Sequence, residues 1–476
     1  MKIHTIVNST PLSRILPSGM VTLDFIRDTL GLKGTKESCR EGDCGTCMVL
    51  VGIPENGQLR YRIMNSCLLP LADIDHSHLV TIEGLNMEGL STIQRLFVSE
   101  GATQCGFCSP GFIVSVTGYL LSCQKPQLSE ALAFLSGNIC RCTGYKAIER
   151  ALEKLLNQLE IPEDGFSQLN QRIDWLIQKR ILPEYFLHIS DRLAELPPSV
   201  QETQKAKHYS LFNVAGGTDL YVQRGEDLEE KEIDRVAGID VKGIIELDDG
   251  RCSMGAATTI SELTESEIIR RFMPHFSDVA RLIACTSIRN RATVGGNIVN
   301  ASPIGDMSII LLALNASILI EGNEGQRETE LQHFFKAYKQ LDLSDGERLK
   351  AIILPSGNCD WFFNFEKVSK RTHLDIASVN SAMHIKVVGN FIVEVFVSAG
   401  GVAPVPLMLH ATNRYLKGRE LTPKLVDDAI STTLSEISPI SDARGSAEYK
   451  RLLLKQLIRA HFERLSEFLT QKTAIR

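Results

Sequence analysis

The sequence predicts a multidomain α+β protein, and three observations support this prediction. The chain has 476 residues, which is too long for one hydrophobic core and suggests three or four domains. Short strand-like runs give way after about residue 88 to the 3.6-residue period of helices, and a mixed pattern returns in the second half. Eight of the twelve cysteines form two quartets within the first 142 residues. We therefore expect several small domains along the chain.

Residues 1–87 are expected to form a mostly β domain with one helix. Strand-like runs occupy Ile3–Val7, Met48–Val51, Tyr61–Met64 and Leu79–Ile82. Thr22–Leu30 has the pattern of a helix that Gly31 ends. The first of these runs is typical of a strand and not of a signal peptide.

Residues 88–160 are expected to form a small four-helix domain. The helical pattern covers Ser91–Glu100, Phe112–Leu121, Ser129–Leu135 and Lys146–Leu159. Glycine and proline cluster beside the cysteines of this region, which indicates turns that direct the thiols inward.

Three further blocks complete the chain. Residues 161–207 carry four prolines amid polar residues and are expected to form a connector with some helix of its own. Residues 208–370 mix strands and helices, and Thr259 with Glu262 fits a capping box that opens a helix. Residues 371–476 begin with strands and end with helices, so we expect a C-terminal α+β domain.

Composition excludes several classes of protein. A formal net charge of -6 gives no electrostatic reason to bind nucleic acid or an anionic membrane. No apolar run approaches the roughly 20 residues that span a bilayer. Twelve cysteines without an export signal favour the reducing cytoplasm, where thiols bind metals and seldom form disulfides.

The spacing of the first cysteine quartet indicates an iron–sulfur centre. Cys39, Cys44 and Cys47 follow the pattern C-x4-C-x2-C, and Cys67 follows after nineteen intervening residues. Four thiolates suit a soft metal centre, and this spacing is typical of plant-type ferredoxins with a [2Fe-2S] cluster. Two glycines in the same loop allow the backbone to curl around a cluster and direct amide donors at its sulfurs.

The second quartet has a different spacing and leaves an alternative open. Cys105-x2-Cys108 is completed by Cys140-x-Cys142 after thirty-one intervening residues. Zinc sites with four cysteines also use CxxC pairs, but they typically close with a second CxxC. The single spacer and the neighbouring plant-type quartet favour a second [2Fe-2S] cluster. Two redox centres on one chain indicate that electrons pass through it.

Other candidate ligands have simpler interpretations. The remaining thiols are expected to be structural, and they are Cys123, Cys252, Cys285 and Cys359. His76 and His78 lie in an acidic, polar segment and are expected to be solvated, with no metal bound there.

Two glycine-rich segments in the second half suit a phosphate group. Val214–Leu220 holds Gly216 and Gly217 between a short strand and a helix, and a second Gly-Gly pair lies at Gly295 and Gly296. Consecutive glycines can turn the backbone so that its N–H groups face a phosphate. Neither segment has the GxGxxG spacing of a Rossmann site.

Together these motifs resemble those of the molybdenum hydroxylase (xanthine dehydrogenase/oxidase) family. The resemblance rests on Cys39–Cys47, Asn65–Leu68, Gln104–Cys108, Cys140–Tyr145, the two Gly-Gly segments and Gly400–Pro404. The order of two iron–sulfur segments and one flavin segment resembles the small subunit of bacterial xanthine dehydrogenases. This resemblance implies a β-grasp ferredoxin-like domain, a four-helix [2Fe-2S] domain, a two-lobed α/β FAD-binding domain and a C-terminal flavoprotein domain.

The resemblance also implies a flavin site. Its residues are Val214, Ala215, Gly216, Gly217, Thr218, Asp219, Leu220, Thr293, Gly295, Gly296, Asn297, Asp306, Leu349 and Lys367. The first loop would hold the diphosphate and ribityl chain of FAD. For Lys367, an exposed lysine in a charged run is an equal alternative. Where many relatives place an aromatic residue against the isoalloxazine ring, this chain has Ile283.

The function that the resemblance implies is electron transfer. Electrons would leave molybdopterin on a separate large subunit, cross the second quartet's cluster and then the first, collect on FAD and reduce NAD. The expected assembly is a heterodimer or a dimer of heterodimers, and no catalytic residue is assigned to this chain. Xanthine or hypoxanthine is the expected substrate. An aldehyde, carbon monoxide or N-heterocycle substrate is the alternative, and so is a redox carrier that turns over no substrate.

Overall fold

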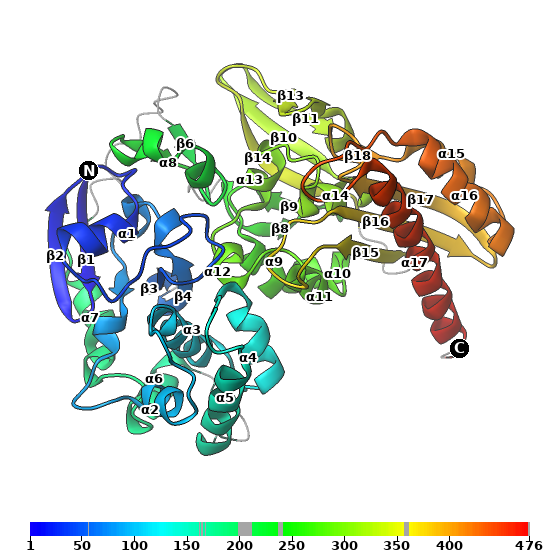
Figure 1. Cartoon of the computed structure of the whole chain (residues 1–476). Coiled ribbons are helices and arrows are strands. Elements are labelled where there is room, and N and C mark those ends of the chain that lie inside the picture. Colours follow the sequence, from blue (N-terminus) through cyan, green and yellow to red (C-terminus); the bar gives the residue numbers. More distant parts are fainter. Residues whose placement is uncertain are drawn as a thin grey trace. The chain divides into compact units, whose positions relative to one another are not determined.

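The structure is a computed structural model that describes residues 1–55, 57–160, 162, 165–166, 168–198, 212–236, 241–356 and 361–474. The chain divides into two compact units, whose elements are drawn in Figure 1. Unit 1 comprises Met1–Arg235 and Cys285–Arg291, and unit 2 comprises Val236–Ala284 and Ala292–Arg476. No described helix is long and apolar enough to cross a membrane.

Unit 1 begins with a five-stranded mixed sheet in the order β2-β1-β5-β3-β4. Its strands are β1 (Lys2–Val7), β2 (Thr10–Ile15), β3 (Met48–Glu55), β4 (Gln58–Asn65) and β5 (His78–Val80). β1 and β5 are parallel, and the other neighbours are antiparallel. The helical segment α1 (Thr22–Asp24) and η1 (Phe25–Thr29) packs on one face of this sheet. This arrangement confirms the predicted ferredoxin-like domain.

The run Met48–Val51 is apolar throughout because both faces of the sheet are covered. Val49 and Val51 pack with Phe25 in one core cluster. Met48 and Leu50 point to the opposite face and share a second cluster with the helical domain. The alternation of strand side chains therefore places consecutive apolar residues in two different cores.

The helical domain of unit 1 contains the four predicted helices. They are α2 (Thr92–Ser99), α3 (Ser109–Ser122), α4 (Leu128–Phe134) and α5 (Lys146–Gln158). α3 is buried on all sides from Gly111 to Leu121, which explains why its sequence is apolar all round. Helices of the predicted connector pack against the same core, through α6 (Leu169–Gln178), η6 (Glu184–His188) and α7 (Ile189–Ala194).

Unit 1 also includes the strand–helix–strand segment that carries the first glycine pair. β6 (Phe212–Val214) and β7 (Ile233–Arg235) are parallel neighbours, joined by α8 (Leu220–Glu229). The Tyr221 hydroxyl donates to the Gly19 carbonyl at 2.8 Å. α8 is therefore tied to the ferredoxin-like domain.

Unit 2 contains a mixed α/β domain around a five-stranded sheet in the order β11-β10-β14-β9-β8. The strands are β8 (Ile244–Glu246), β9 (Cys252–Gly255), β10 (Ser317–Gly322), β11 (Gly325–Glu330) and β14 (Arg348–Leu354). The helices are α9 (Ile260–Glu265), α10 (Glu267–Phe272), α11 (Phe276–Arg281), α13 (Val294–Val299) and α14 (Asp306–Ala313). Thr259 and Glu262 form the predicted capping box at the start of α9. A short hairpin, β12 (Phe335–Ala337) and β13 (Gln340–Leu341), follows η9 (Leu331–His333).

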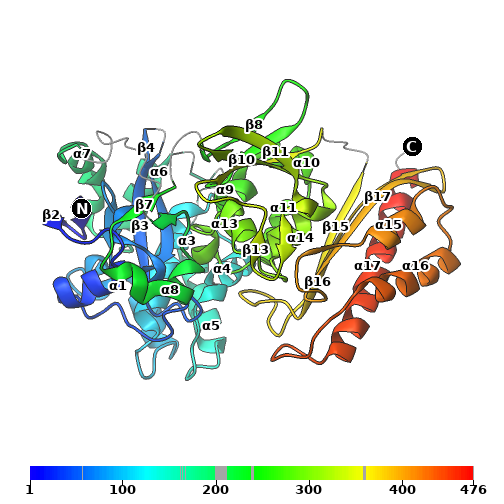
Figure 2. The ribbon, with the colours of Figure 1, turned by 90° about the horizontal axis from the view of Figure 1, so that it is seen from above.

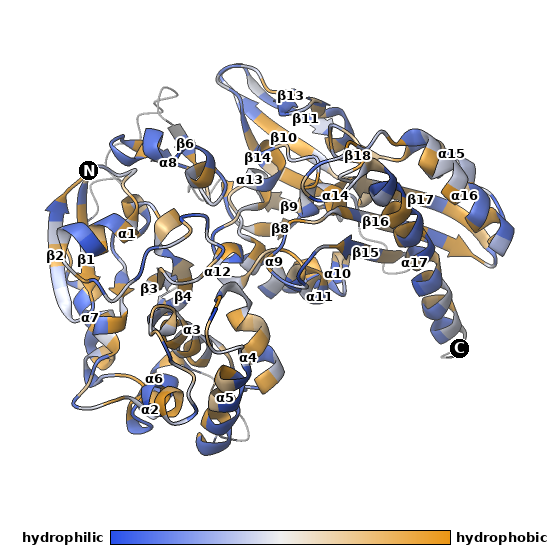
Figure 3. Cartoon of the chain, viewed as in Figure 1, coloured by the Kyte–Doolittle hydropathy of each residue, from blue (hydrophilic) through white to orange (hydrophobic). Residues whose placement is uncertain are grey.

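The C-terminal part of unit 2 is a four-stranded antiparallel sheet between helices. Its strands are β15 (Phe362–Val368), β16 (Val379–Val388), β17 (Phe391–Gly400) and β18 (Leu407–Met408). The helices that follow or flank it are α15 (His410–Leu416), α16 (Pro423–Glu436) and α17 (Ala447–Ala474). On β16, Ala382 faces the cluster with α14, whereas Met383 faces the cluster with α16 and α17. Figure 2 shows α14 and α17 on opposite sides of this sheet, and Figure 3 shows the polar residues of α17 in blue.

Candidate functional site

The β3–β4 hairpin brings two cysteines of the first quartet together. Met48 and Asn65 are paired across the hairpin, so Cys47 and Cys67 lie next to each other at its end. Their sulfur atoms are 3.4 Å apart, and both residues are buried. Asn65 directs its side-chain Nδ2 toward the Cys47 sulfur at 3.9 Å.

The loop before β3 supplies the other two cysteines. The Cys39 thiol donates to the Cys44 sulfur, and this contact lowers the pKa of Cys44 to about 4 although burial opposes the ionised form. The Glu41 amide donates to the Cys39 sulfur at 3.4 Å. Gly42 and Gly45 have φ angles of +77° and +69°, a backbone region that favours glycine. The loop therefore curls so that its donors face its own sulfurs.

The second quartet also forms two pairs. The Cys105 and Cys142 sulfurs are 3.5 Å apart and exposed, while Cys108 forms a side-chain hydrogen bond with the buried Cys140. Cys108 is the N-cap of α3, and the loop that holds Cys140 and Cys142 leads into α5. Two helix ends thus bring together cysteines that lie more than thirty residues apart in the chain.

The pairing of the thiols bears on which metal centre the second quartet suits. A [2Fe-2S] cluster offers two irons to four cysteines, so each iron takes one pair of thiolates. Both quartets fit that donor arrangement.

The remaining thiols and histidines have structural surroundings. Cys252 and Cys285 are buried, Cys123 is half-buried, and Cys359 lies outside the described residues. The expectation of a solvated histidine is wrong for His78, which is fully buried beside Tyr61, Tyr185 and Phe186. Burial lowers the pKa of His78 to about 3, so this histidine is neutral.

The first glycine segment lies in unit 1 between β6 and α8. Gly217 has a φ of +71°, and a Cβ there would come within 3.0 Å of the Tyr221 ring. The Gly216 carbonyl accepts two hydrogen bonds from Arg291, from Nε at 3.1 Å and from Nη2 at 2.5 Å. The turn is therefore fixed by its own helix and by an arginine from a distant segment.

Arg291 is a site residue that the sequence did not identify. Its side chain is 7% exposed, and Nη1 forms an ion pair with the Asp73 carboxylate at 2.5 Å. Arg235, at the end of β7, contacts the same carboxylate. Arg291 lies two residues before Thr293 in the sequence. No sequence motif identifies an arginine whose role is to donate hydrogen bonds to a backbone carbonyl.

The second glycine segment forms the start of α13 in unit 2. The Thr293 hydroxyl accepts from the Gly296 amide at 3.0 Å and caps the helix. A Cβ on Gly295 would lie 2.6 Å from the Cβ of Ala256, so the absence of a side chain is required by packing. Asn297 accepts from the Ser308 amide at 3.2 Å, which connects α13 with α14.

Asp306 and Lys367 form a buried ion pair in unit 2. Lys367 Nζ donates to Asp306 Oδ2 and to the Leu282 carbonyl, both at 2.7 Å, and its side chain is 2% exposed. The alternative of an exposed lysine is therefore wrong. Asn380 donates to the other Asp306 oxygen at 2.6 Å, so the carboxylate is held at both oxygens.

Leu349 and Ile283 both belong to the buried core of unit 2. Leu349 lies on β14 and is 5% exposed, and Ile283 follows α11 and is 6% exposed. Assignment of the predicted flavin residues to flavin contacts remains a prediction for both segments.

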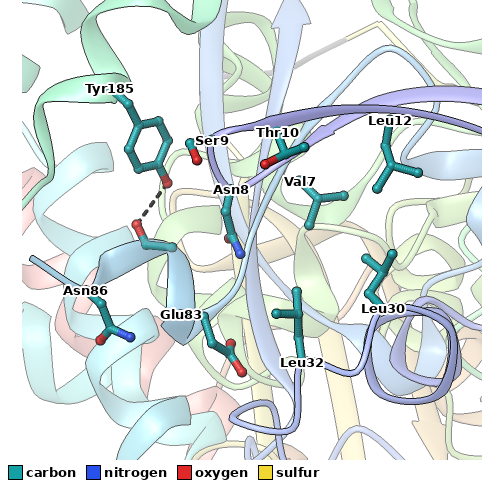
Figure 4. A pocket seen from close by; sticks show the side chains of 11 residues that line it. Val7, Asn8, Ser9, Thr10, Leu12, Leu30, Leu32, Glu83, Asn86 and Tyr185 are labelled. Atoms are coloured by element: carbon teal, nitrogen blue, oxygen red, sulfur yellow. Dashed lines mark hydrogen bonds between the residues drawn. The ribbon is translucent and has the colours of Figure 1, made fainter.

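A cavity of about 440 Å³ lies on the ferredoxin-like domain and contains none of the predicted site residues. Figure 4 shows its lining, with Tyr185 donating to the Gly84 carbonyl at 2.9 Å. The lining residues are Val7, Asn8, Ser9, Thr10, Leu12, Leu30, Leu32, Glu83, Gly84, Asn86 and Tyr185. No cysteine lies among them, so the cavity is separate from the two quartets.

Four family models match the chain in order. They are a 2Fe-2S iron-sulfur cluster binding domain at residues 11–71, a [2Fe-2S] binding domain at 81–153, an FAD binding domain in molybdopterin dehydrogenase at 194–357, and a CO dehydrogenase flavoprotein C-terminal domain at 365–465. The two cysteine quartets fall within the first two matches. The predicted multidomain architecture is thereby confirmed.

Curated relatives are similar along nearly the whole chain. Xanthine dehydrogenase 1 of Arabidopsis thaliana is 28% identical over 92% of this chain and 38% of the relative. Aldehyde oxidase 1 of Bos taurus is 26% identical over 94% of this chain and 38% of the relative. The chain therefore spans a little over a third of the length of these relatives.

Solved structures resemble about half of the chain. A carbon monoxide dehydrogenase from Hydrogenophaga pseudoflava is 26% identical with a TM-score of 0.50, covering 52% of this chain and 86% of that chain. Quinoline 2-oxidoreductase from Pseudomonas putida 86 has a TM-score of 0.50, covers 56% and 94% of the two chains, and at 22% identity shows the fold alone. With its paired cysteine quartets, its FAD-binding domain and these relatives, the chain belongs to the molybdenum hydroxylase family, of which it carries the electron-transferring iron–sulfur and flavin domains.

Proposed function

We propose that this chain is the electron-transfer subunit of a cytoplasmic xanthine dehydrogenase. It would take electrons from a partner subunit that carries molybdopterin, pass them through its two cysteine quartets and deliver them through FAD to NAD. Bound FAD stores two electrons and releases them as hydride, which couples single-electron transfer to the reduction of NAD. The protein's own contribution is to hold and orient these groups and to set their electrostatic surroundings.

The observation that carries this proposal is the presence of two paired quartets and an FAD-binding domain in the same chain. Each quartet presents two pairs of thiols, which suits the two irons of one cluster. A carrier without turnover would not require the FAD-binding and C-terminal domains that follow at residues 194–357 and 365–465.

The exposed apolar side chains around the second quartet support entry of electrons there. Phe107, Ile139 and Tyr145 lie within three residues of its cysteines and are 45%, 38% and 47% exposed. Exposed apolar residues that gather in one place mark an interaction surface. The exposed Cys105 and Cys142 belong to the same region, whereas Cys47 and Cys67 of the first quartet are buried. We propose that the molybdopterin subunit covers this part of the helical domain.

The names of the relatives support the proposed substrate. Xanthine dehydrogenases of plants and animals align with nearly the whole chain, which favours xanthine. The likeness to a carbon monoxide dehydrogenase favours the alternative of another substrate. We propose that the partner subunit oxidises xanthine or hypoxanthine.

A first experiment tests the cofactors and the acceptor. The chain is purified under nitrogen, its iron, sulfide and flavin are measured, and EPR spectra are recorded after dithionite reduction. We expect about four irons and one FAD in each chain, two distinct EPR signals and NADH-dependent reduction of a dye. Zinc in the second quartet or a single EPR signal would contradict the proposal, and flavin without NADH oxidation would favour the carrier.

A second experiment tests the partner and the substrate. The chain is co-expressed with a molybdopterin-binding subunit from the same genome and purified through a tag on this chain alone. We expect a stable complex that reduces NAD with xanthine and does not oxidise carbon monoxide. Activity with carbon monoxide or quinoline in place of xanthine would establish the alternative.

A further inference from the structure

The loop Cys140–Tyr145 places two hydrogen-bond donors of one residue on one sulfur atom. The Thr143 hydroxyl lies 3.0 Å from the Cys140 sulfur, and the Thr143 amide lies 3.4 Å from the same atom. Cys140 is 6% exposed, so little water competes for this sulfur. The two donors leave the sulfur in a fixed polar environment.

The direction of the Thr143 hydroxyl proton is set by its neighbour. A hydroxyl has one proton to donate and lone pairs with which to accept. The Tyr145 amide donates to the Thr143 oxygen at 3.3 Å, which occupies a lone pair and leaves the proton for the sulfur. The Tyr145 hydroxyl accepts from the Cys140 amide at 3.1 Å. Tyr145 adopts this position with a φ of +67°, which a non-glycine residue seldom takes.

The first quartet has a hydroxyl donor that is placed less favourably, although several backbone amides also donate to its sulfurs. The Thr46 hydroxyl is 3.3 Å from the Cys44 sulfur, but the Lys36 carbonyl at 3.5 Å is a second acceptor for the same proton. Glu41 and Asn65 donate at 3.4 Å and 3.9 Å. The Thr143 hydroxyl therefore lies closer to its sulfur than the Thr46 hydroxyl does. The Thr143 proton is also directed to the sulfur, whereas the Thr46 proton has two acceptors.

We propose that Thr143 is a positioning and tuning residue that raises the reduction potential of the second quartet's centre. Reduction adds negative charge, and a donor held against a ligand sulfur stabilises the reduced form more than the oxidised form. Removal of the hydroxyl lowers the potential, so the centre accepts electrons less readily. This inference rests on the proposed function, because it requires an iron–sulfur centre at the second quartet.

The experiment is an EPR-monitored redox titration of the whole complex with its molybdopterin subunit. Wild type is compared with Thr143→Val, which replaces the hydroxyl with a methyl group, and with Thr143→Ser, which keeps the hydroxyl. In Thr143→Val we expect the reduced-to-oxidised ratio of the second centre at a fixed potential to fall roughly threefold to tenfold, a shift of about 30–60 mV. Thr143→Ser stays near wild type. The first centre, measured in the same sample, keeps its potential in both variants.

Several results would overturn the inference. They are an unchanged potential in Thr143→Val, an equal shift of both centres, or a shift in Thr143→Ser as large as that in Thr143→Val. If Thr143→Val does not hold iron, Thr143→Ala is titrated in its place, because alanine adds no methyl group against the sulfur. Loss of iron in both, with iron retained in Thr143→Ser, would make the hydroxyl structural and overturn tuning. A wild-type protein without a second EPR signal would instead contradict the proposed function.

Discussion

Arg291 joins three parts of unit 1 through one side chain. It donates to the Gly216 carbonyl at the first glycine turn and forms an ion pair with Asp73 of the ferredoxin-like domain. Both Arg291 and Asp73 are almost fully buried, at 7% and 5% exposed. A buried charge without its partner is costly, because the surrounding protein does not solvate it as water would. Arg291 therefore positions the turn as well as stabilising the unit.

We expect Arg291→Met to destabilise unit 1 by about 3 kcal/mol, the lower end for removal of one member of a buried ion pair, because Arg235 still contacts Asp73. Urea unfolding is followed by Trp175 fluorescence in a Trp361→Phe background, so that the signal comes from unit 1. Arg14→Gln, at an exposed arginine of β2, is the control and should change stability by less than about 0.5 kcal/mol. Equal effects of the two substitutions would contradict the role given to Arg291.

At the residue scale, the sequence predicts those residues whose spacing matches a known motif. The spacing C-x4-C-x2-C and CxxC marks the cysteines of both quartets, but only Cys39 and Cys44 pair within one short loop. The other three pairs join a motif to a distant segment, across the β3–β4 hairpin or between two helix ends. Asp73 and Arg291 belong to no such motif, since their contact depends on how distant segments pack. The burial of His78 was missed for the same reason: its neighbours Tyr185 and Phe186 come from the predicted connector.

At the scale of elements, α17 is connected to its sheet by a directed chain of hydrogen bonds. Asn364 on β15 donates to Nδ1 of His461 at 2.8 Å, and Nε2 of His461 faces the Ser381 hydroxyl on β16 at 3.1 Å. The Ser381 hydroxyl donates in turn to the Ser398 carbonyl at 2.8 Å. His461 is fully buried, and burial lowers its pKa to about 3. The packing of α17 against its sheet therefore requires His461 to be neutral.

This burial predicts a loss of stability in acid. The unfolded chain binds a proton at His461 below the ordinary pKa of 6.5, and the folded chain does so only near pH 3, so stability is complete above pH 6.5 and falls as pH is lowered. His461 alone should remove about 1.4 kcal/mol between pH 7.5 and 5.5. Urea midpoints are measured with Trp361 fluorescence in a Trp175→Phe background. We expect His461→Gln to be less stable than wild type at pH 7.5. Its loss of stability between pH 7.5 and 5.5 should be smaller than that of wild type by about 1.4 kcal/mol. An identical loss in the two proteins would exclude His461 as its source.

The start of α2 gives a second test at this scale. Ser91 and Gln94 form a reciprocal capping box, with the Ser91 hydroxyl accepting from the Gln94 amide at 3.2 Å. We expect Ser91→Ala to cost about 1 kcal/mol, because the first turn loses an acceptor for one of its free amides. The matched control is Ser99→Ala at the exposed end of the same helix, with a change below about 0.5 kcal/mol. Unfolding is followed as for Arg291, and a larger effect at Ser99 would contradict the capping role.

Helices and strands could be predicted where a buried face gives the sequence a regular pattern of apolar residues. The helices of the second domain and strands β1, β3, β4 and β5 have apolar patterns that match their buried faces. β2 was missed because it is an edge strand with five of its six residues exposed and Pro11 within it. A strand with no buried face leaves no apolar alternation to detect.

At the scale of the whole molecule, the two compact units do not follow the order of the predicted blocks. The connector at 161–207 contributes Ile173, Leu176 and Phe186 to the core of the iron–sulfur domains, so its described part is packed structure. The two glycine segments fall in different units, with Gly216 in unit 1 and Gly295 in unit 2. Boundaries drawn from composition could not show this, because they assume that each block folds on neighbours in the chain. The five predicted domain limits remain predictions.

Because the insert Cys285–Arg291 belongs to unit 1, the two units cannot be separated by a single cut in the chain. The polypeptide passes between the units three times, after Arg235, after Ala284 and after Arg291. Ile288 in this insert lies against Gly42, and Cys285 lies against Gly137, so seven residues from beyond the first junction complete the packing of both cysteine loops. A single genetic break at Arg235 would leave the iron–sulfur half without this insert, and splitting the protein into two independent polypeptides would require that its packing be replaced.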